Sequence, residues 1–198
     1  MIWLAIGCAR QEPVPAAQPP VTTFRFAVVG DRTDEPNDVA WRRILTQVEA
    51  LRPDLVLTVG DLADDALDPT DWDTALAATE VLTAPIEFTP GNHDIVDEAT
   101  AEVFTDRTGQ APYRSFEWSG MHFVIVDNAI AESWETLPEG QRTWLEADLA
   151  AHVGQPIAVF MHKPFWATRA ALGKPDPMHD LFVRSGVRAV FTGHWHNH

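Results

Sequence analysis

Short apolar runs alternate along the chain with longer segments whose apolar residues recur every three or four positions. The short runs are rich in β-branched residues and several end at glycine, a pattern typical of buried strands, whereas the longer segments are typical of amphipathic helices. We predict strands at 24–29, 55–59, 86–89, 157–160 and 187–191. We predict helices at 38–51, 71–82, 139–151 and 177–185.

Strand–helix alternation up to residue 89 predicts a largely parallel sheet, and such sheets bind ligands beyond the carboxyl ends of their strands. The pattern changes at 113–126, where two strand-like runs flank Ser119-Gly120 and predict a hairpin. Segments 97–112 and 128–138 are predicted to be loops and are the candidates for determining substrate specificity. We expect one face of the first helix to be buried, formed by Val39, Ile44, Leu45, Val48 and Leu51.

The net charge of −15 argues against a nucleic-acid-binding protein, which needs a basic face. It also looks unfavourable for an anionic substrate, unless bound divalent cations invert the local field. No apolar run reaches the length of about 18–20 residues that crosses a membrane. The single cysteine, Cys8, excludes a disulfide within the chain.

The first twenty residues differ from the rest of the chain. A short apolar run ends at Gly7-Cys8, and a Pro-, Ala- and Gln-rich spacer follows at 11–20. This order resembles a bacterial lipoprotein signal, so we expect an exported protein tethered to a membrane through lipidated Cys8, with residues 21–198 as its domain. It lacks a basic N-terminal region, and the alternative is an untranslocated cytoplasmic protein with an incidental cysteine.

Two Gly-Asp pairs follow predicted strands, with Asp31 after the first and Asp61 after the second. Each aspartate alone could be a turn residue or a helix cap. Neighbouring parallel strands would bring the two carboxylates close together, which is costly without a cation. The pair therefore favours a metal site.

Polar side chains also follow the later strands. Asn92 and His93 lie on a Pro-Gly turn, and His162 follows an apolar strand. His194 and His196 flank Trp195 and would face the same way on an extended segment. Trp166 and Trp195 neighbour these loops, so we expect them to wall a substrate pocket. Three histidines outside the loops are expected to have no functional role, namely His122, His152 and His179.

These five segments, taken in order, resemble the motifs of the calcineurin-like metallophosphoesterases. The resemblance covers residues 24–198, and four of the five motifs match in full. It implies an α/β fold, a four-layer sandwich of two mixed β-sheets flanked by helices. Members of the family usually continue beyond the last motif, so we expect the domain to lack its C-terminal strands.

The resemblance also implies two divalent metal ions, Mn, Fe, Zn or Co, that share one carboxylate. The ligands of the first ion would be Asp31, Asp61 and His196. The ligands of the second ion would be Asp61, Asn92, His162 and His194. Beside them, His93 would protonate the leaving oxygen and Asp64 would orient His93. Asn92 and His93 would also contact substrate.

One position departs from the family pattern, because Thr33 stands where the first motif usually has a histidine. Threonine is a poor ligand for transition metals that prefer imidazole, so the first ion would have one protein ligand fewer. A water or Asp34 could take that place. Arg32 could contact the substrate phosphate, although an exposed surface arginine is the simpler interpretation.

The sequence therefore predicts a metal-dependent hydrolase that cleaves a small phosphoester by attack of a metal-bridging hydroxide, with His93 as general acid. The main alternative is a phosphoesterase-like binding module that binds metal but is weakly active or inactive. A third hypothesis is a surface lipoprotein with incidental histidines. The identity of the ester and the choice between mono- and diester are left open.

Overall fold

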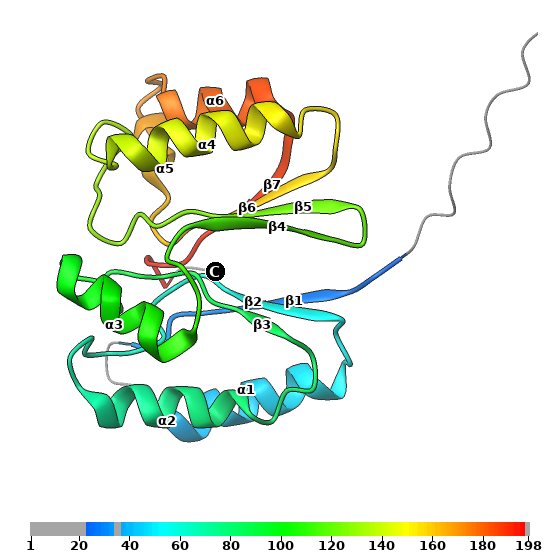
Figure 1. Cartoon of the computed structure of the whole chain (residues 1–198), viewed down its shortest axis with the longest axis vertical. Helices are drawn as coiled ribbons and strands as arrows, with labels where there is room; N and C mark the ends of the chain where they lie inside the picture. Colours follow the sequence, from blue (N-terminus) through cyan, green and yellow to red (C-terminus); the bar gives the residue numbers. More distant parts are fainter. Residues whose placement is uncertain (1–22, 34–36, 197–198) are drawn as a thin grey trace, which may run out of the picture.

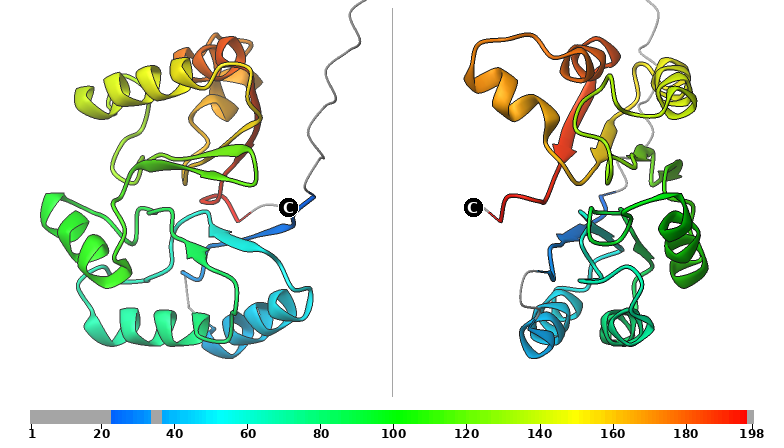
Figure 2. Two further views of the ribbon diagram at one scale, coloured as in Figure 1. Left: turned by 45° about the vertical axis from the view of Figure 1, so that its right-hand side comes forward. Right: turned by 90° about the vertical axis from the view of Figure 1, so that its left-hand side faces the viewer.

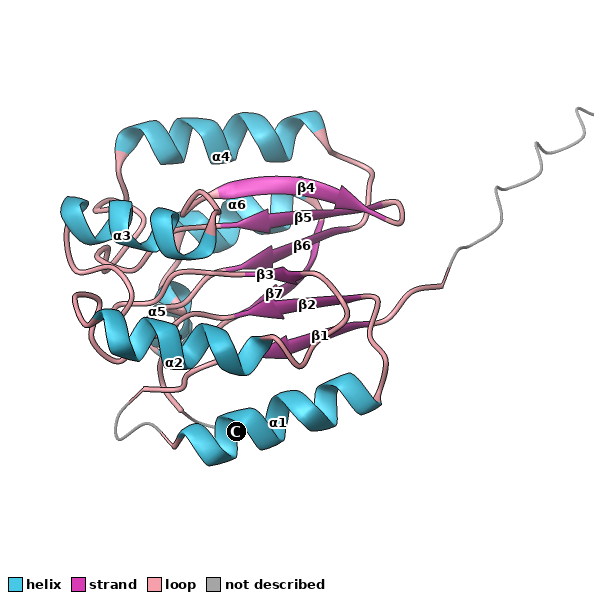
Figure 3. Cartoon of the chain, turned by 60° about the horizontal axis from the view of Figure 1, so that its bottom comes forward, coloured by secondary structure: helices cyan, strands magenta, loops and turns pink. Residues whose placement is uncertain are grey.

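Two β-sheets pack face to face in the computed structural model, which describes residues 23–33 and 37–196, and helices cover the outer face of each sheet (Figure 1). Turning the molecule shows the four layers, helices–sheet–sheet–helices, with the strands of both sheets in the middle (Figures 2 and 3). The predicted α/β sandwich is confirmed.

The first sheet has the order β1-β2-β3 and is parallel throughout. Its strands are β1 (Phe26–Val29), β2 (Leu55–Thr58) and β3 (Ile86–Glu87), joined through α1 (Asp38–Ala50) and α2 (Pro69–Thr79). The prediction that both sheets are mixed is therefore wrong for the described strands of this sheet. Strand–helix–strand connections make neighbouring strands parallel, as the alternating pattern required.

The second sheet has the order β4-β5-β6-β7 and is mixed. A hairpin pairs β4 (Arg114–Trp118) antiparallel to β5 (Met121–Ile125), whereas β6 (Ile157–Phe160) and β7 (Val187–Phe191) run parallel to β5. Two helices cover this sheet, α4 (Glu139–Ala151) and α6 (Pro177–Ser185). The bounds of α4, β6, α6 and β7 are those predicted.

Two helices are absent from the sequence prediction. Helix α3 (Glu98–Thr108) occupies most of the segment predicted as a specificity loop, and α5 (Phe165–Ala171) follows β6. Helix α3 begins with a capping box between Asp97 and Thr100 and ends at Gly109 in the left-handed conformation. Those local signals are present in the sequence, but its apolar positions are too few to show a helical period.

Three apolar layers hold the sandwich together. The middle one lies between the sheets and contains interlocking rings of Phe26, Phe123, Phe160 and Phe191. The outer two lie between each sheet and its helices. Strands buried on both faces read as continuous apolar runs, which is why β2 and β6 are easily recognised.

The predicted buried face of α1 is right at Leu45 and Val48 and wrong at its other positions. Val39 is 81% exposed and Leu51 is 68% exposed, whereas Trp41 and Leu45 are buried. Large aromatic and aliphatic side chains one helical turn apart, at 41 and 45, set the face that packs on the sheet. The more numerous aliphatic residues around the rest of the helix mislead a prediction based on their spacing.

Within the described residues, no helix is both long enough and apolar enough to cross a bilayer. The predicted tether and Cys8 fall outside those residues and stay predictions.

Candidate metal centre

Two Gly-Asp turns lie side by side at the carboxyl ends of β1 and β2. The backbone amide of Asp31 donates to Gly60 O over 3.2 Å, and that of Arg32 donates to Asp61 O over 2.9 Å. Asp31 and Asp61 both adopt positive φ, 56° and 55°. Non-glycine residues rarely adopt this conformation, and it clusters at functional sites. The turns thus direct both carboxylates to the same edge of the sheet.

Glycines let two further loops approach these carboxylates. A Cβ atom on Gly91 would collide with the carboxylate and backbone amide of Asp61, and one on Gly193 would collide with the carboxylate of Asp31. The loops after β3 and β7 therefore need glycine at these two positions. They bring in Asn92 and His194.

The predicted ligands form two overlapping groups. Ligand atoms of Asp61, His162 and His194 all lie within 4.8 Å of one another, and so do those of Asp31, Asp61 and His196. Asn92 joins the former set, because its Oδ1 lies 3.1 Å from Nε2 of His162. We call Asp31, Asp61 and His196 the first-ion group, and Asp61, Asn92, His162 and His194 the second-ion group. Asp61 belongs to both.

His162 is oriented as a metal ligand. Its Nδ1 lies 2.8 Å from the carbonyl oxygen of Val59, which can only accept a hydrogen bond, so Nδ1 carries a proton. This leaves Nε2 facing Asp61 Oδ2 at 3.1 Å. A backbone carbonyl that fixes the ring in this way is the usual partner of a metal-binding histidine.

Asp31 supplies an independent observation that a cation fits. Its Oδ2 accepts from the backbone amide of His194 over 2.6 Å and lies 3.2 Å from Nε2 of His196. Its Oδ1 is buried and has no hydrogen-bond partner in the described part of the chain. A buried carboxylate oxygen without a partner is costly, and a metal ion bound there would remove that cost.

Burial and neighbouring charges shift the pKa values of these groups. Burial raises the pKa of Asp31. Burial also opposes ionisation of Asp61, but the hydrogen bond and charge of His162 outweigh it, so the pKa of Asp61 is lowered. The same contact raises the pKa of His162 against the effect of burial. A proton and a metal ion would therefore compete for Nε2 of His162.

His93 lies beside the shared carboxylate. Its backbone amide donates to Asp61 Oδ1 over 3.0 Å, and its Nδ1 lies 2.9 Å from the carbonyl oxygen of Asp64. The carboxylate of Asp64 is 3.7 Å away. The expected orientation of His93 by Asp64 therefore has a geometric basis, in which the backbone carbonyl makes the closer contact.

Arg32 makes internal contacts only among those described. Its guanidinium donates to Asp38 over 2.6 Å, to Asp71 over 2.7 Å and to the carbonyl of Leu62 over 3.0 Å, and the side chain is 2% exposed. Asp71 in turn accepts from the amide of Asp64. The simpler interpretation, an exposed surface arginine, is therefore wrong. The network braces the loop after β2, so it favours a structural role for Arg32 over a contact with substrate.

Thr33 is buried, and its hydroxyl lies 3.4 Å from Asp61 Oδ2. It therefore contacts the shared carboxylate but brings no nitrogen ligand to the first-ion group. The other candidate for that place, Asp34, lies outside the described residues and stays a prediction.

Asp94, which follows His93, has no role in the sequence prediction. Its fully buried carboxylate accepts from the amides of Leu62 over 2.9 Å, Ala63 over 2.8 Å and Gly91 over 2.8 Å. Burial raises its pKa to about 7, against those hydrogen bonds. Asp94 thus joins the loop of Asp61 to the loop of Asn92.

Asn128 is a further residue of the site that sequence reasoning misses. Its side chain is fully buried, its Oδ1 accepts from the amides of His162 over 2.9 Å and Lys163 over 3.1 Å, and its Nδ2 donates to Lys163 O over 2.7 Å. It therefore holds the loop that carries His162. A lone asparagine after a strand gives no sequence signal of this role.

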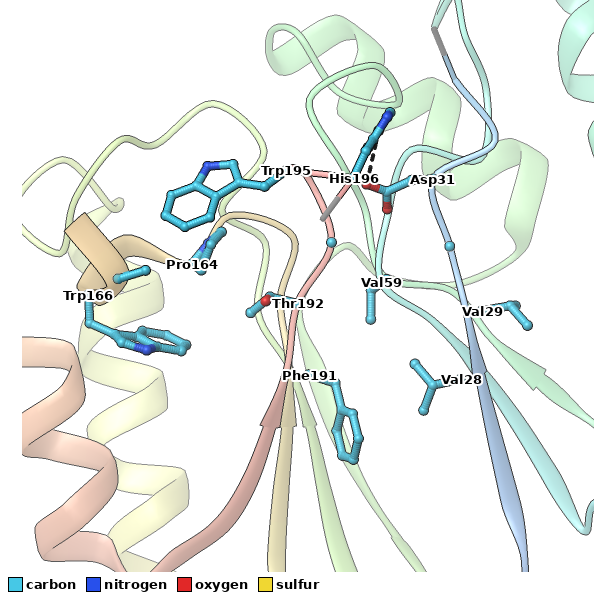
Figure 4. Close-up of a pocket in the computed structure, with 13 residues that line it drawn as sticks. Val28, Val29, Asp31, Val59, Pro164, Trp166, Phe191, Thr192, Trp195 and His196 are labelled. Carbon is cyan, nitrogen blue, oxygen red and sulfur yellow. Dashed lines mark ion pairs between the residues drawn. The ribbon is translucent and has the colours of Figure 1, made fainter. Parts of the chain in front are cut away.

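A cavity of about 510 Å³ opens beside the first-ion group. Figure 4 shows Trp166 and Trp195 on one flank, Val28 and Val29 on the other, and the Asp31–His196 pair at one end. Both tryptophans expected to wall a pocket therefore line this cavity.

The sequence profile of calcineurin-like phosphoesterases matches residues 24–198. The chain is 29% identical over 133 residues to the human serine/threonine-protein phosphatase CPPED1, an alignment covering 57% of this chain and 41% of that protein. It is 28% identical over 208 residues to purple acid phosphatase 18 of Arabidopsis thaliana, covering 92% and 45%. Glycerophosphodiester phosphodiesterase GpdQ of Enterobacter lignolyticus is 28% identical over 133 residues, covering 61% and 46%. The chain thus spans less than half the length of these relatives.

Solved structures share the fold. Purple acid phosphatase PPD1 from yellow lupin superposes with a TM-score of 0.64 at 18% identity, covering 88% of this chain and 38% of that one. TT1561 of Thermus thermophilus superposes with a TM-score of 0.58 at 14% identity, covering 86% and 81%. Together with the match over nearly all described residues, these similarities identify the chain as a member of the calcineurin-like phosphoesterase family.

Proposed function

We propose that this chain hydrolyses small phosphate esters with two divalent metal ions held by the first-ion and second-ion groups. One observation carries the proposal: two sets of ligand atoms, each within 4.8 Å, share the buried carboxylate of Asp61. When bound, such a pair of ions polarises phosphoryl oxygens and lowers the pKa of a coordinated water. The relatives of the chain include proteins named as phosphatases and one named as a phosphodiesterase, which supports hydrolysis of a phosphate ester as the reaction class.

The residues of the chain would divide the remaining work. Asp61 would contribute to both ligand groups and so keep the two ions close together. The amide oxygen of Asn92 lies beside Nε2 of His162. His93 is partly exposed, so its ring can reach a bound ester. To donate a proton from Nε2 while Nδ1–H faces Asp64, the ring must be an imidazolium, and the Asp64 carboxylate at 3.7 Å stabilises that cation. His93 would therefore protonate the leaving oxygen.

The cavity beside the centre suits an ester with an apolar or aromatic leaving group. Its flanks are valine side chains and two indoles, which offer apolar contact and stacking but few fixed hydrogen bonds. An aryl phosphate is thus the appropriate first substrate.

The test uses the full chain loaded with Mn²⁺, Zn²⁺, Fe²⁺ or Co²⁺, assayed with p-nitrophenyl phosphate and bis(p-nitrophenyl) phosphate. We expect hydrolysis of at least one ester, and a fall in kcat of about 10²–10⁴-fold in His93→Ala at unchanged metal content. His179→Ala, an exposed histidine on α6, serves as the control. Metal binding without hydrolysis of either ester in any metal would overturn the proposal.

A second candidate is a binding module with little activity. It is favoured by Thr33, which occupies the place of a histidine ligand and only touches Asp61 Oδ2. If the natural chain shows no hydrolysis, Thr33→His separates the two candidates. Hydrolysis gained by the variant would support an enzyme weakened at its first-ion group. A variant that binds two ions and still hydrolyses neither ester would favour the module.

A further inference from the structure

A second group of histidines and carboxylates lies at the opposite end of the second sheet from the metal centre. Glu117 and His122 face each other across the β4–β5 hairpin, and Asp148 and His152 lie one turn apart at the end of α4. His122 stands at the start of β5, beside Ile157 at the start of β6, whereas His162 follows the end of β6. The two sites are thus about 15 Å apart along the strands. We call Glu117, His122, Asp148 and His152 the histidine cluster.

Asp148 fixes both imidazole rings. Nε2 of His122 lies 2.8 Å from Asp148 Oδ2, and Nδ1 of His152 lies 2.7 Å from the backbone oxygen of Asp148. The other carboxylate oxygen of Asp148 accepts from the hydroxyl of Ser115 over 2.7 Å. Because these oxygens act as acceptors, the ring nitrogens that face them carry the protons.

The remaining ring nitrogens therefore point their lone pairs at one acceptor. Nδ1 of His122 lies 2.7 Å from Glu117 Oε1, and Nε2 of His152 lies 3.7 Å from the same oxygen. A lone pair opposite a carboxylate is repulsive unless a cation lies between them. A proton on His122 satisfies one of these contacts at most, whereas a metal ion can take all three atoms, which lie within 4.8 Å of one another.

We propose that Glu117, His122 and His152 bind one divalent transition-metal ion, separate from the phosphoesterase centre. Two nitrogens and one carboxylate oxygen suit Zn²⁺, with an open fourth position for water. The Asp148 contacts are those that orient histidine ligands elsewhere, a carboxylate for one ring and a backbone carbonyl for the other. The ion also neutralises the two carboxylates of the cluster.

The geometry has to adjust in a defined way. Zinc bonds of about 2.0–2.2 Å place ligand atoms roughly 3.3 Å apart, so Glu117 withdraws slightly from His122. The rings of His122 and His152 now stack at 3.6 Å with planes 13° apart, so the His152 ring tilts out of the stack to direct Nε2 at the ion. Glu117 and His152 are 50% and 25% exposed, whereas His122 is 2% exposed, so the movable ligands close onto a fixed one.

The test counts bound Zn²⁺ per full chain by mass spectrometry after buffer exchange. Buried His122 is left intact, and His152→Ala and Glu117→Ala remove the two more accessible ligands. Each is expected to bind one equivalent fewer than the natural chain, whereas His179→Ala binds the same number. In His162→Ala, which damages the phosphoesterase centre, the equivalent belonging to the histidine cluster is retained.

A pH series supplies a second readout. Zn²⁺ and protons compete for the same nitrogens of a histidine ligand, so affinity at this site should be higher at a pH of about 7.5 than at a pH of about 5.5. The proposal is overturned if folded His152→Ala and Glu117→Ala both bind as many equivalents as the natural chain across that range. Such a result would mean that a proton, and no metal ion, bridges the side chains of the histidine cluster.

Discussion

The first-ion and second-ion groups share Asp61 but are held very differently. In the second-ion group the side chain of His162 is fully buried, its ring is fixed by Val59, and its loop is clasped by Asn128. In the first-ion group His196 is 38% exposed and Asp31 keeps a buried oxygen without a partner among the described residues. One half of the centre is preorganised, and the other depends more on what binds there.

This difference predicts unequal metal affinities. A preorganised ligand set loses less conformational entropy on binding, so the second-ion group should bind first and exchange slowly. The first-ion group has fewer protein ligands, because Thr33 brings only a hydroxyl near Asp61. We expect its ion to be the one that limits activity at low metal concentration.

The largest effect should come from His162→Ala. It removes the buried ligand of the second-ion group, and we expect metal affinity at that group to fall by more than about 100-fold, beyond the loss typical for outer partners of a ligand. Competition with a chelating dye measures this. Equal affinities for the natural chain and the variant would show that His162 is not a ligand.

Asn128→Asp should have the next largest effect. It keeps the oxygen that accepts from His162 but replaces the donor that faces Lys163 O with a second oxygen. We expect affinity at the second-ion group to fall by about 10–100-fold, with the first-ion group little changed. Asp127→Asn is the matched control, because Asp127 caps its own loop at Ala129. A loss confined to the first-ion group would contradict the comparison.

Thr33→His should have the smallest effect, and in the opposite direction. An added imidazole beside Asp61 should tighten the first-ion group by about tenfold, or about 1.4 kcal/mol. Thr33→Val, which removes the hydroxyl at similar size, should give no gain. Isothermal titration with Co²⁺ in a His152→Ala background, which excludes the histidine cluster, separates the two steps. If Thr33→His instead strengthened only the tighter binding step, residue 33 would belong to the second-ion group and the prediction would be wrong.

Much of the fold and of the centre is predictable from the sequence, for a shared reason. Strands buried on both faces give unmistakable apolar runs, and the candidate ligands follow those strands directly, as Asp61 follows β2 and His162 follows β6. Parallel pairing then brings the strand ends together without further information. Local order along the chain is therefore enough to bring the candidate ligands together.

The remaining features depend on contacts that no local pattern encodes. Asn128 acts through a loop 34 residues away in the chain. His122 and His152, predicted to have no role, meet only because the end of α4 packs over the β4–β5 hairpin. The sequence suggests that Arg32 is an exposed surface residue or a contact for substrate, yet its side chain is buried and its guanidinium donates to Asp38 and Asp71. Tertiary packing decides each of these.

The most direct test of the shared centre is an electron paramagnetic resonance titration with Mn²⁺ in a His152→Ala background, which excludes the histidine cluster. One equivalent should give an isolated-ion spectrum, and a second should convert it to that of an exchange-coupled pair bridged by Asp61. Asp61→Asn should weaken binding and abolish the coupling. Two equivalents that bind with uncoupled spectra in the unsubstituted Asp61 protein would contradict the account.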